Sequence, residues 1–410
     1  MRRLPILALC IATVLGRVAI AEPPAETVGR SLSLPEQPGP HWFWLSDILL
    51  HRTALFDGDA GELLGTITSG TPGVGFVISP LFSADHKEIY LAETYYARGV
   101  RGERTDVVTV YDAHTLRPLA EIPIPAKRAE YFPGNAANAL SADGRFMAVF
   151  NLTPGSSLSI VDLKTRRFAG EVSTPGCSVV YAAGPRRFLM LCANGAMLSV
   201  NLNEQGQLLS LERSDPFFDP QRDPITEKAV RRGNEWLFVS FNGKLYAVDV
   251  SEPQLHFAEP WSLLDEGDHG AGWRVGGGQH LALHAATGRL YMLMHQGGPD
   301  THKEPGTEIW VYDLARHRRV QRISVLNPLV SFVGQLALSR GTWAQIGRWI
   351  LARTLPNPGV DRILVTQDAH PILIASASLP PTVTIHDAIS GEVVREVSEP
   401  GLAGSLLFAP

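Results

Sequence analysis

The segment VYDAHTLRPLAEI, residues 110–122, is the most informative part of the sequence, because its pattern recurs along the whole chain. It consists of a short apolar run of strand-forming residues, an aspartate, a polar turn and a second β-rich run. LFDGDAGELLGTI at 55–67 and IVDLKTRRFAGEV at 160–172 repeat this pattern. Four more copies are SVNLNEQGQLLSL at 199–211, AVDVSEPQLHFAE at 247–259, VYDLARHRRVQRI at 311–323 and IHDAISGEVVREV at 385–397. The chain therefore contains seven related units.

A second phrase, a polar turn followed by an apolar strand, precedes several of these units. It occurs as SADHKEIYLA at 83–92, SADGRFMAVF at 141–150, ATGRLYMLM at 286–294 and QDAHPILIAS at 367–376. Each unit is therefore predicted to hold three or four antiparallel strands joined by tight turns. Helical periodicity is poor and glycines and prolines are frequent, which argues against a helical solenoid.

A single sheet of this kind cannot bury both of its faces. Seven sheets in a ring can, because each packs against two neighbours and the ring leaves only short, protected edges. Residues 22–410 divide into units of about 56 residues, longer than compact propeller repeats, so long loops are expected. We predict an all-β fold, one seven-bladed β-propeller domain over 22–410. The aspartate before each turn is expected to cap backbone amides and not to catalyse, since the seven would lie far apart.

The spacing of these aspartates is broken once. Neighbouring copies are 39 to 64 positions apart, except for the 74 positions between Asp313 and Asp387. We attribute the excess to an inserted segment around 331–361, which is either a helical excursion or a long loop over one face. Its Trp343 and Trp349 either anchor a partner or pack on the blade beneath.

Residues 1–21 have the features of a secretory signal peptide. A positively charged start precedes the apolar run 4–15, and Ala19 and Ala21 are small residues at the positions that a signal peptidase recognises. We expect cleavage after Ala21 and export of a soluble protein. The apolar run is too short to cross a bilayer, and no later stretch reaches about 18 uninterrupted apolar residues, so no membrane span is predicted.

The composition is typical of a soluble globular chain, with 45% hydrophobic and 19% charged positions in 410 residues. It excludes disorder, collagen and a disulfide-stapled miniprotein. Lys and Arg number 36 against 41 Asp and Glu, a formal net charge of −5. There is no basic excess to neutralise phosphates, so nucleic acid is not an expected partner.

Three cysteines are present, and signal cleavage would remove Cys10. A lipid anchor on Cys10 is disfavoured because the bulky Leu9 stands where a small residue is typical. The remaining pair, Cys177 and Cys192, has fourteen residues between its members. After export such a pair forms either a disulfide, which we predict, or two buried thiols. A disulfide closing a ring of this size stabilises by about 3 kcal/mol in the chain-entropy model.

Residues that would carry independent chemistry are sparse. Four histidines gather in one repeat, namely His280, His284, His295 and His302. Their spacing matches neither a metal-binding helix pair nor a zinc knuckle, so no metal site is predicted. Gly276–Gly278 is not followed by a helix that would present amides to a phosphate, and the Gly-x-Ser-x-Gly turn of hydrolases is absent. Trp42–Trp44 either cover a partner or pack on the first blade.

Two long blocks carry a family resemblance. They are TYYARGVRGERTDVVTVYDAHTLRPLAEIPIP at 94–125 and GWRVGGGQHLALHAATGRLYMLMHQGGPDTHKEPGTEIWVYDL at 272–314. Both resemble the large (heavy, or alpha) subunit of the quinoprotein amine dehydrogenases, the group of methylamine and aromatic amine dehydrogenase. The similarity extends to the cysteine spacing, the leader and the final block ILVTQDAHPILIASAS at 363–378, so it covers most of the chain. Its more specific parts are the string RGERTD at 101–106 and the His302–Lys303 pair.

The resemblance implies a seven-bladed propeller with no cofactor and no catalytic residue of its own. In that family, tryptophan tryptophylquinone is made from two tryptophans of a separate, small, disulfide-rich subunit, and the assembly is a periplasmic α2β2 heterotetramer. The implied reaction is oxidation of a primary amine to an aldehyde and ammonia, with electrons passed to a small blue-copper protein. With three cysteines, this chain is not the disulfide-rich subunit.

In this family one large-subunit phenylalanine projects into the substrate channel, and ungapped counting from the string at 101–106 places it on Phe76. Either Phe76 limits which amine enters, or it is an ordinary strand residue packed in a blade. Two other classes of function remain open. One is a stand-alone exported propeller module that binds without catalysing. The other is a propeller enzyme acting alone, such as a lactonase-like hydrolase, for which no central cluster of acids and histidines is found in the sequence.

Overall fold

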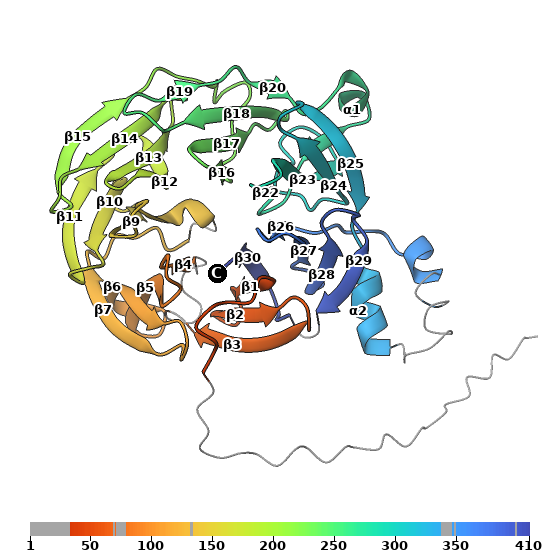
Figure 1. Ribbon diagram of the computed structural model, residues 1–410, viewed down its shortest axis with the longest axis horizontal. Coiled ribbons are helices and arrows are strands. Elements are labelled where there is room, and N and C mark those ends of the chain that lie inside the picture. Colours follow the sequence, from red (N-terminus) through yellow and green to blue (C-terminus); the bar gives the residue numbers. More distant parts are fainter. Residues whose placement is uncertain are drawn as a thin grey trace, which may run out of the picture. The chain divides into compact units, whose positions relative to one another are not determined.

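Seven antiparallel sheets surround a common axis in the computed structural model (Figure 1). The structure describes residues 33–68, 70, 79–131, 134–337, 347, 350–397 and 400–410. The predicted seven-bladed β-propeller is therefore confirmed. The leader and Phe76, Trp343 and Trp349 lie outside the described residues.

Blades 2 to 4 each contain four strands, which run in order from the innermost outward. Blade 2 comprises β4 (Leu81–Phe82), β5 (Glu88–Arg98), β6 (Arg101–Asp112) and β7 (Pro118–Ile124). Blade 3 comprises β8 (Asn138–Leu140), β9 (Phe146–Asn151), β10 (Ser157–Asp162) and β11 (Arg167–Ser173). Blade 4 comprises β12 (Cys177–Gly184), β13 (Arg187–Cys192), β14 (Met197–Leu202) and β15 (Leu208–Arg213).

Blades 5 to 7 follow the same order, with two additions. Blade 5 comprises β16 (Val230–Arg232), β17 (Glu235–Val239), β18 (Lys244–Asp249) and β19 (His256–Phe257), and β20 (Trp261–Ser262) also pairs with β18. In blade 6, β21 (Trp273–Val275) and β22 (Leu281–His284) both pair with β23 (Arg289–Gln296), followed by β24 (Glu308–Asp313) and β25 (Arg318–Ser324). Blade 7 comprises β26 (Arg362–Val365), β27 (Ile372–Ala377), β28 (Thr382–Asp387) and β29 (Val393–Val397).

Blade 1 closes the ring because it joins strands from both ends of the chain. Its innermost strand is β30 (Gly404–Phe408), which pairs with β1 (Trp42–Asp47), and β2 (Arg52–Asp57) and β3 (Glu62–Thr68) complete the sheet. Leu45 lies opposite Leu407 in this seam. The contact between β30 and β1 therefore ties the last strand of the chain to the first.

The core of the described residues consists of seven hydrophobic clusters, each shared by two neighbouring blades. Phe146 of blade 3 and Phe188 of blade 4, for example, are fully buried in one cluster. Strand residues that face one neighbour alternate with residues that face the other, so the second and third strands of most blades are buried on both sides, whereas the outermost strands are largely exposed. Blade-to-blade packing explains why the strands form continuous apolar runs.

The two faces of the ring differ in what they carry. Strands within a blade alternate in direction, so the turns between strands one and two and between three and four lie on one face, the turn face. The turns between strands two and three and the blade-to-blade links lie on the other, the connection face. The long connection 214–229 therefore lies on the connection face, and so do the described parts of the links that follow β7 and β25.

The recurring aspartates lie at the end of the third strand of their blades, on the turn face. Asp112, for example, accepts backbone hydrogen bonds from His114 (3.0 Å) and Thr115 (2.7 Å). The same capping occurs at Asp57, Asp162, Asp249, Asp313 and Asp387. Blade 4 differs, because Asn201 donates to Ser210 while Asn203 caps the turn. The structural role predicted for the aspartates is confirmed.

Cys177 and Cys192 form the predicted disulfide. They lie directly opposite each other on β12 and β13, and both are buried. The bond therefore joins the two inner strands of blade 4.

The excess length before blade 7 is at least partly helical. Helix α2 (Pro328–Ala337) lies outside blade 7, next to β28 and β29 (Figure 1), and residues 350–354 are also helical. The Asn327 side-chain amide donates to the carbonyls of Leu355 (3.3 Å) and Pro356 (3.1 Å), which holds the departing and returning chain together. The described residues at the two ends of this segment are therefore helical, and the first helix starts slightly before residue 331.

Candidate functional site

A cavity of about 770 Å³ occupies the axis of the ring. Residues from the innermost strands of all seven blades line it, and apolar side chains predominate, among them Phe82, Leu140, Val180, Leu283, Leu364 and Leu407. A volume of this size fits a ligand of ordinary small-molecule dimensions. We refer to it as the central channel.

Two glutamine side chains form hydrogen bonds with backbone amides and carbonyls in or next to the strands that line this channel. Gln279 Nε2 donates to the Leu407 carbonyl (2.9 Å) and Gln279 Oε1 accepts from the Leu407 amide (2.8 Å). Gln367 donates to the Leu283 carbonyl (2.7 Å) and accepts from the Ala285 amide (3.0 Å). Because these groups are paired, they brace blades 6, 7 and 1 and are not free to bind a ligand.

The channel wall also contains an ion pair on the link into blade 5. Lys228 Nζ donates to Glu227 Oε1 at 2.8 Å, and only 9% of the Lys228 side chain is exposed. Burial raises the pKa of Glu227, but the charge and hydrogen bond of Lys228 lower it more, so the net shift is downward. The Glu227 carboxylate is therefore charged at neutral pH and is paired with the Lys228 side chain.

Next to this pair lies a buried histidine. His280 Nε2 contacts Thr226 Oγ1 at 3.0 Å and its Nδ1 contacts the Gly277 carbonyl at 3.2 Å. Burial, together with the charge of Lys228, lowers the pKa of His280 to about 3. This imidazole is therefore neutral at ordinary pH and has a structural role.

The four clustered histidines serve separate local contacts. His284 contacts Thr287 and the Asp368 carbonyl, His295 contacts Thr301, and the His302 ring stacks on Phe241 at 3.7 Å. Over the part of the chain that the structure describes, no group of three His, Cys, Asp or Glu side chains is arranged to hold a metal ion.

The Gly276–Gly278 turn is explained by packing. A Cβ atom on Gly276 would clash with His295 Nδ1, and Gly277 has a φ of +110°. Glycine is required here because the turn between β21 and β22 passes close to neighbouring chain.

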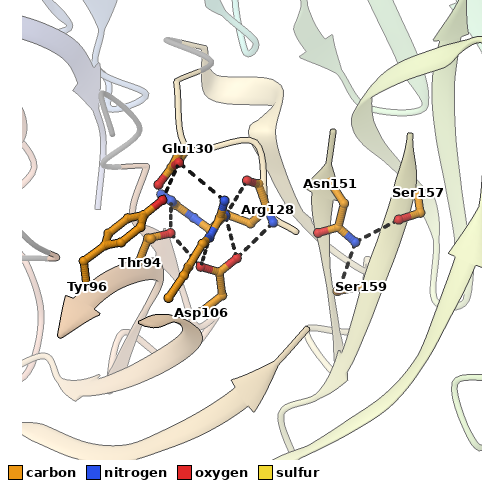
Figure 2. A network of polar contacts seen from close by, with 9 residues as sticks. Thr94, Tyr96, Asp106, Arg128, Glu130, Asn151, Ser157 and Ser159 are labelled. Carbon is orange, nitrogen blue, oxygen red and sulfur yellow. Dashed lines mark hydrogen bonds and ion pairs between the residues drawn. The ribbon is translucent and has the colours of Figure 1, made fainter. Parts of the chain in front are cut away.

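A network of charged side chains joins blade 2 to the link that leads into blade 3 (Figure 2). Arg104 makes a two-pronged contact with Asp106 (2.9 and 2.8 Å) and reaches Glu130 at 3.4 Å. The Arg128 amide donates to Asp106 Oδ2 (2.9 Å), which also accepts from Arg104, and Tyr96 donates to Glu130 (3.1 Å). The string at 101–106 therefore supplies two members of this network.

The described tryptophans of this chain do not form a candidate redox centre at the channel. Trp273 and Trp310 lie 5.0 Å apart, but both are buried in the cluster between blades 5 and 6. Arg322 and Arg319 cover Trp310, and its Nε1 donates to Glu308. This pair fits structural packing and does not fit a quinone cofactor that must meet a substrate.

Trp42 and Trp44 pack into the cluster between blades 1 and 2, and Trp44 contacts Phe82 at 6.0 Å between ring centroids. The packing alternative for these tryptophans is therefore confirmed.

Sequence reasoning did not identify the Glu227–Lys228 pair, the bracing role of Gln279, or Arg128 and Glu130 as partners of the string at 101–106. The contacts of Gln279, Arg128 and Glu130 join segments from different blades, for which a single sequence carries no periodic signal. For Glu227 and Lys228, the sequence showed only two adjacent opposite charges within a loop, which does not indicate that they line the channel.

Fold and site together define a seven-bladed propeller protein whose candidate working surfaces are its central channel and its connection face. A family model described as methylamine dehydrogenase heavy chain matches residues 48–332. Because this match covers more than half of the chain, the chain belongs to the methylamine dehydrogenase heavy chain family. The resemblance found in the sequence is thereby confirmed.

Curated relatives carry the same name. The methylamine dehydrogenase heavy chain of Paracoccus versutus is 27% identical over 349 residues, covering 85% of this chain and 73% of the relative. That of Methylophilus methylotrophus is 24% identical over 355 residues, covering 86% and 78%. The similarity therefore extends well beyond single motifs.

Solved structures support the fold. A dihydro-heme d1 dehydrogenase superposes with a TM-score of 0.53 at 17% identity, covering 92% of this chain and 77% of that one. A functionally unknown protein from Desulfotomaculum acetoxidans gives 0.57 at 12% identity, covering 89% and 98%. At these identities the likeness concerns architecture alone.

Proposed function

We propose that this chain is the cofactor-free large subunit of an exported amine dehydrogenase that oxidises primary amines to aldehyde and ammonia. The carrying observation is the family match over residues 48–332, supported by relatives that align along most of the chain. The tryptophan tryptophylquinone belongs to a separate small subunit in this proposal, in an α2β2 assembly. That group supplies the carbonyl that reacts with the amine and takes up two electrons from it. The electrons are then passed to a blue-copper protein.

In the reaction, this chain holds the small subunit and orients it. The ring is braced on all sides by interblade clusters, and the Gln279 and Gln367 contacts stiffen its inner strands. A rigid frame keeps a neighbouring subunit in one position, which matters because small misplacements of reacting groups lower rates strongly.

The connection face is the proposed docking side for the small subunit. Exposed apolar side chains are found on its loops, among them Leu49, Leu152, Leu379 and Leu402. Exposed apolar side chains on such loops are available for contact with a partner.

Residues 1–21 are proposed to direct export to the periplasm and to be removed after Ala21. No helix in the described residues is both long and apolar enough to cross a membrane. Mass spectrometry of the purified chain should find a mature terminus at Glu22, whereas an intact leader would contradict export by this route.

Co-expression with the small-subunit gene from the same genome tests the proposed function. We expect a complex with quinone absorbance and amine-dependent reduction of a dye, neither of which the large subunit shows by itself. If the chain purifies without a partner, or if no small, cysteine-rich chain is encoded nearby, the stand-alone binding module replaces this proposal. If the isolated chain turns over a substrate, the role as a cofactor-free subunit is refuted.

Phe76 is proposed to narrow the passage through which the amine reaches the quinone. Replacing Phe76 with Ala should change kcat/KM in favour of longer amines by about tenfold, because a removed ring admits extra methylenes. Steady-state kinetics with a series of primary amines measures this shift. Phe168→Ala, which removes an exposed ring from β11, the outermost strand of blade 3, is the control and should leave the ranking unchanged. An unaltered ranking in Phe76→Ala would remove Phe76 from the channel.

A further inference from the structure

The second and third strands of blade 2 extend far beyond their blade. β5 has 11 residues and β6 has 12, whereas the equivalent strands of the other blades have five to eight. Pairing continues from Thr94↔Asp106 to Arg98↔Arg101 at the end of the hairpin. At about 3.3 Å per residue, this extension, the blade-2 arm, projects roughly 15 Å from the connection face.

Buried charges hold the arm at its base. Asp106, Arg128 and Glu130, which lie close together in Figure 2, are all less than a tenth exposed. Arg104 bridges the two carboxylates. Arg128 also donates to Thr94 at 3.0 Å, which ties the opposite strand of the arm to the link into blade 3. A network of four largely buried charges is seldom more stable than apolar packing. Its known advantage is that it favours a single conformation of the residues involved. The arm is therefore held rigidly at its base.

The tip of the arm carries an unfavourable charge pair. Arg98 and Arg101 face each other across the two strands, and like charges in that position repel. No carboxylate of the described residues forms an ion pair with either guanidinium. Val100, between them in sequence, is 62% exposed, and residues 97–103 are all exposed. A rigid support thus presents two unneutralised arginines and an apolar side chain to the outside.

Exposed apolar residues flank the base of the arm. Tyr131 follows Glu130 directly and is 56% exposed, and Leu152 follows Asn151, which bridges to Arg128, and is 59% exposed. The surface around the arm therefore combines cationic and apolar groups, a composition typical of protein interfaces in which arginine and aromatic residues are enriched.

We propose that the tip of the blade-2 arm is a docking element for an acidic patch on the small subunit, with Arg98 and Arg101 each pairing with a carboxylate. This inference rests on the proposed function. A tip fixed at its base suits a lasting subunit contact, because a preorganised element loses little freedom on binding. Pairing with carboxylates removes the repulsion between the two arginines, and Val100 adds apolar contact beside them.

Charge reversal at the tip tests the proposal. In the complex co-expressed with its small subunit, Arg98→Glu/Arg101→Glu should weaken subunit affinity by about tenfold or more at low salt. High salt should reduce this difference, because screening acts on exposed charges. Arg117→Glu/Arg167→Glu, which makes the same charge change on the turn face, is the matched control and should bind like the wild type. Equal circular dichroism spectra and melting temperatures of the isolated large subunits establish that all variants fold.

The outcomes separate this inference from the proposed function. If the wild type binds the small subunit and the tip variant binds equally well, the arm is not the docking element, while the proposed function stands. If the tip variant assembles normally but reduces the blue-copper acceptor more slowly, the partner of the arm is the acceptor and the inference is overturned. If the wild type binds no small subunit, the proposed function itself fails.

Discussion

Single aspartates at the ends of third strands determine the geometry of the turn face. At Asp112 one carboxylate oxygen accepts hydrogen bonds from the amides of His114 and Thr115 and from the Thr115 hydroxyl. The Thr115 amide bond lowers the pKa of Asp112 most, and the Thr115 hydroxyl and His114 add to the shift. The carboxylate is therefore a cap that works in its charged form.

Replacing Asp112 with Ala should lower the free energy of unfolding by about 1 kcal/mol at pH 7, the usual loss for a side-chain cap. The pKa of Asp112 is lowered in the folded state, so its stabilisation is present above the ordinary carboxyl pKa of 3.8 and disappears as the pH falls through the folded-state value. Urea unfolding at pH 7 and at about pH 3 measures both effects. Glu259→Ala, an exposed residue, is the control, and a variant as stable as that control would contradict the capping role.

Between elements, the side chain of one histidine joins the first blade to the last blade. His41, just before β1, contacts Asp59 through Nδ1 (2.7 Å) and Asp368 through Nε2 (3.2 Å). Asp59 belongs to a turn of blade 1 and Asp368 to a turn of blade 7. Burial lowers the pKa of His41, but the two carboxylates raise it more, so the net shift is upward.

The contact of His41 with two carboxylates predicts a pH-dependent contribution to the free energy of unfolding. A raised pKa in the folded state means that the stabilisation is complete below the ordinary histidine pKa of 6.5 and is lost as the pH rises through the folded-state value. The wild type should therefore exceed His41→Ala in stability by more at pH 6 than at pH 9, as measured by urea unfolding. The double variant Asp59→Asn/Asp368→Asn should remove this pH dependence. A difference that does not vary with pH would show that His41 serves only as a packing residue.

In the molecule as a whole, β30 closes the ring. The family match ends before β30 in the sequence. The matched region stops at residue 332, whereas blade 7 and β30 follow it in sequence. Asp47 of blade 1 also accepts hydrogen bonds from the amides of Leu402 (2.6 Å) and Ala403 (3.1 Å). The last residues therefore complete the same sheet that the first strands begin.

Removing residues 404–410 should leave blade 1 without its inner strand and expose the apolar cluster that it shares with blade 7. We expect broad, non-cooperative urea unfolding and increased binding of a hydrophobic dye, because an unclosed ring leaves edges and faces uncovered. Deleting residues 22–33, which precede the closed ring, is the control and should preserve a sharp transition. A sharp transition in the shortened chain would show that closure by β30 is dispensable.

Much of the architecture could be predicted from the chain, because every blade repeats a local pattern. Strand, aspartate and turn occupy adjacent positions, so their hydrogen bonds form between near neighbours and leave a periodic trace. Asn203 shows the limit of this approach, since the repeat alignment places Asn201 at the cap while the blade-4 turn uses a residue two positions later. The site was less predictable, because Gln279 and Leu407 are 128 positions apart.

The order of amino acids was sufficient to establish the number of blades, the capping role of the aspartates, the cysteine pair and the family, all of which rest on local repeats or on motifs within a continuous stretch. The folded ring was needed to show which side chains meet across blades, including the Arg104–Glu130 contact at the arm and the bracing of the channel by Gln279. Ring closure brings together residues that are remote along the chain. Their contacts depend on blade-to-blade packing and not on any local preference.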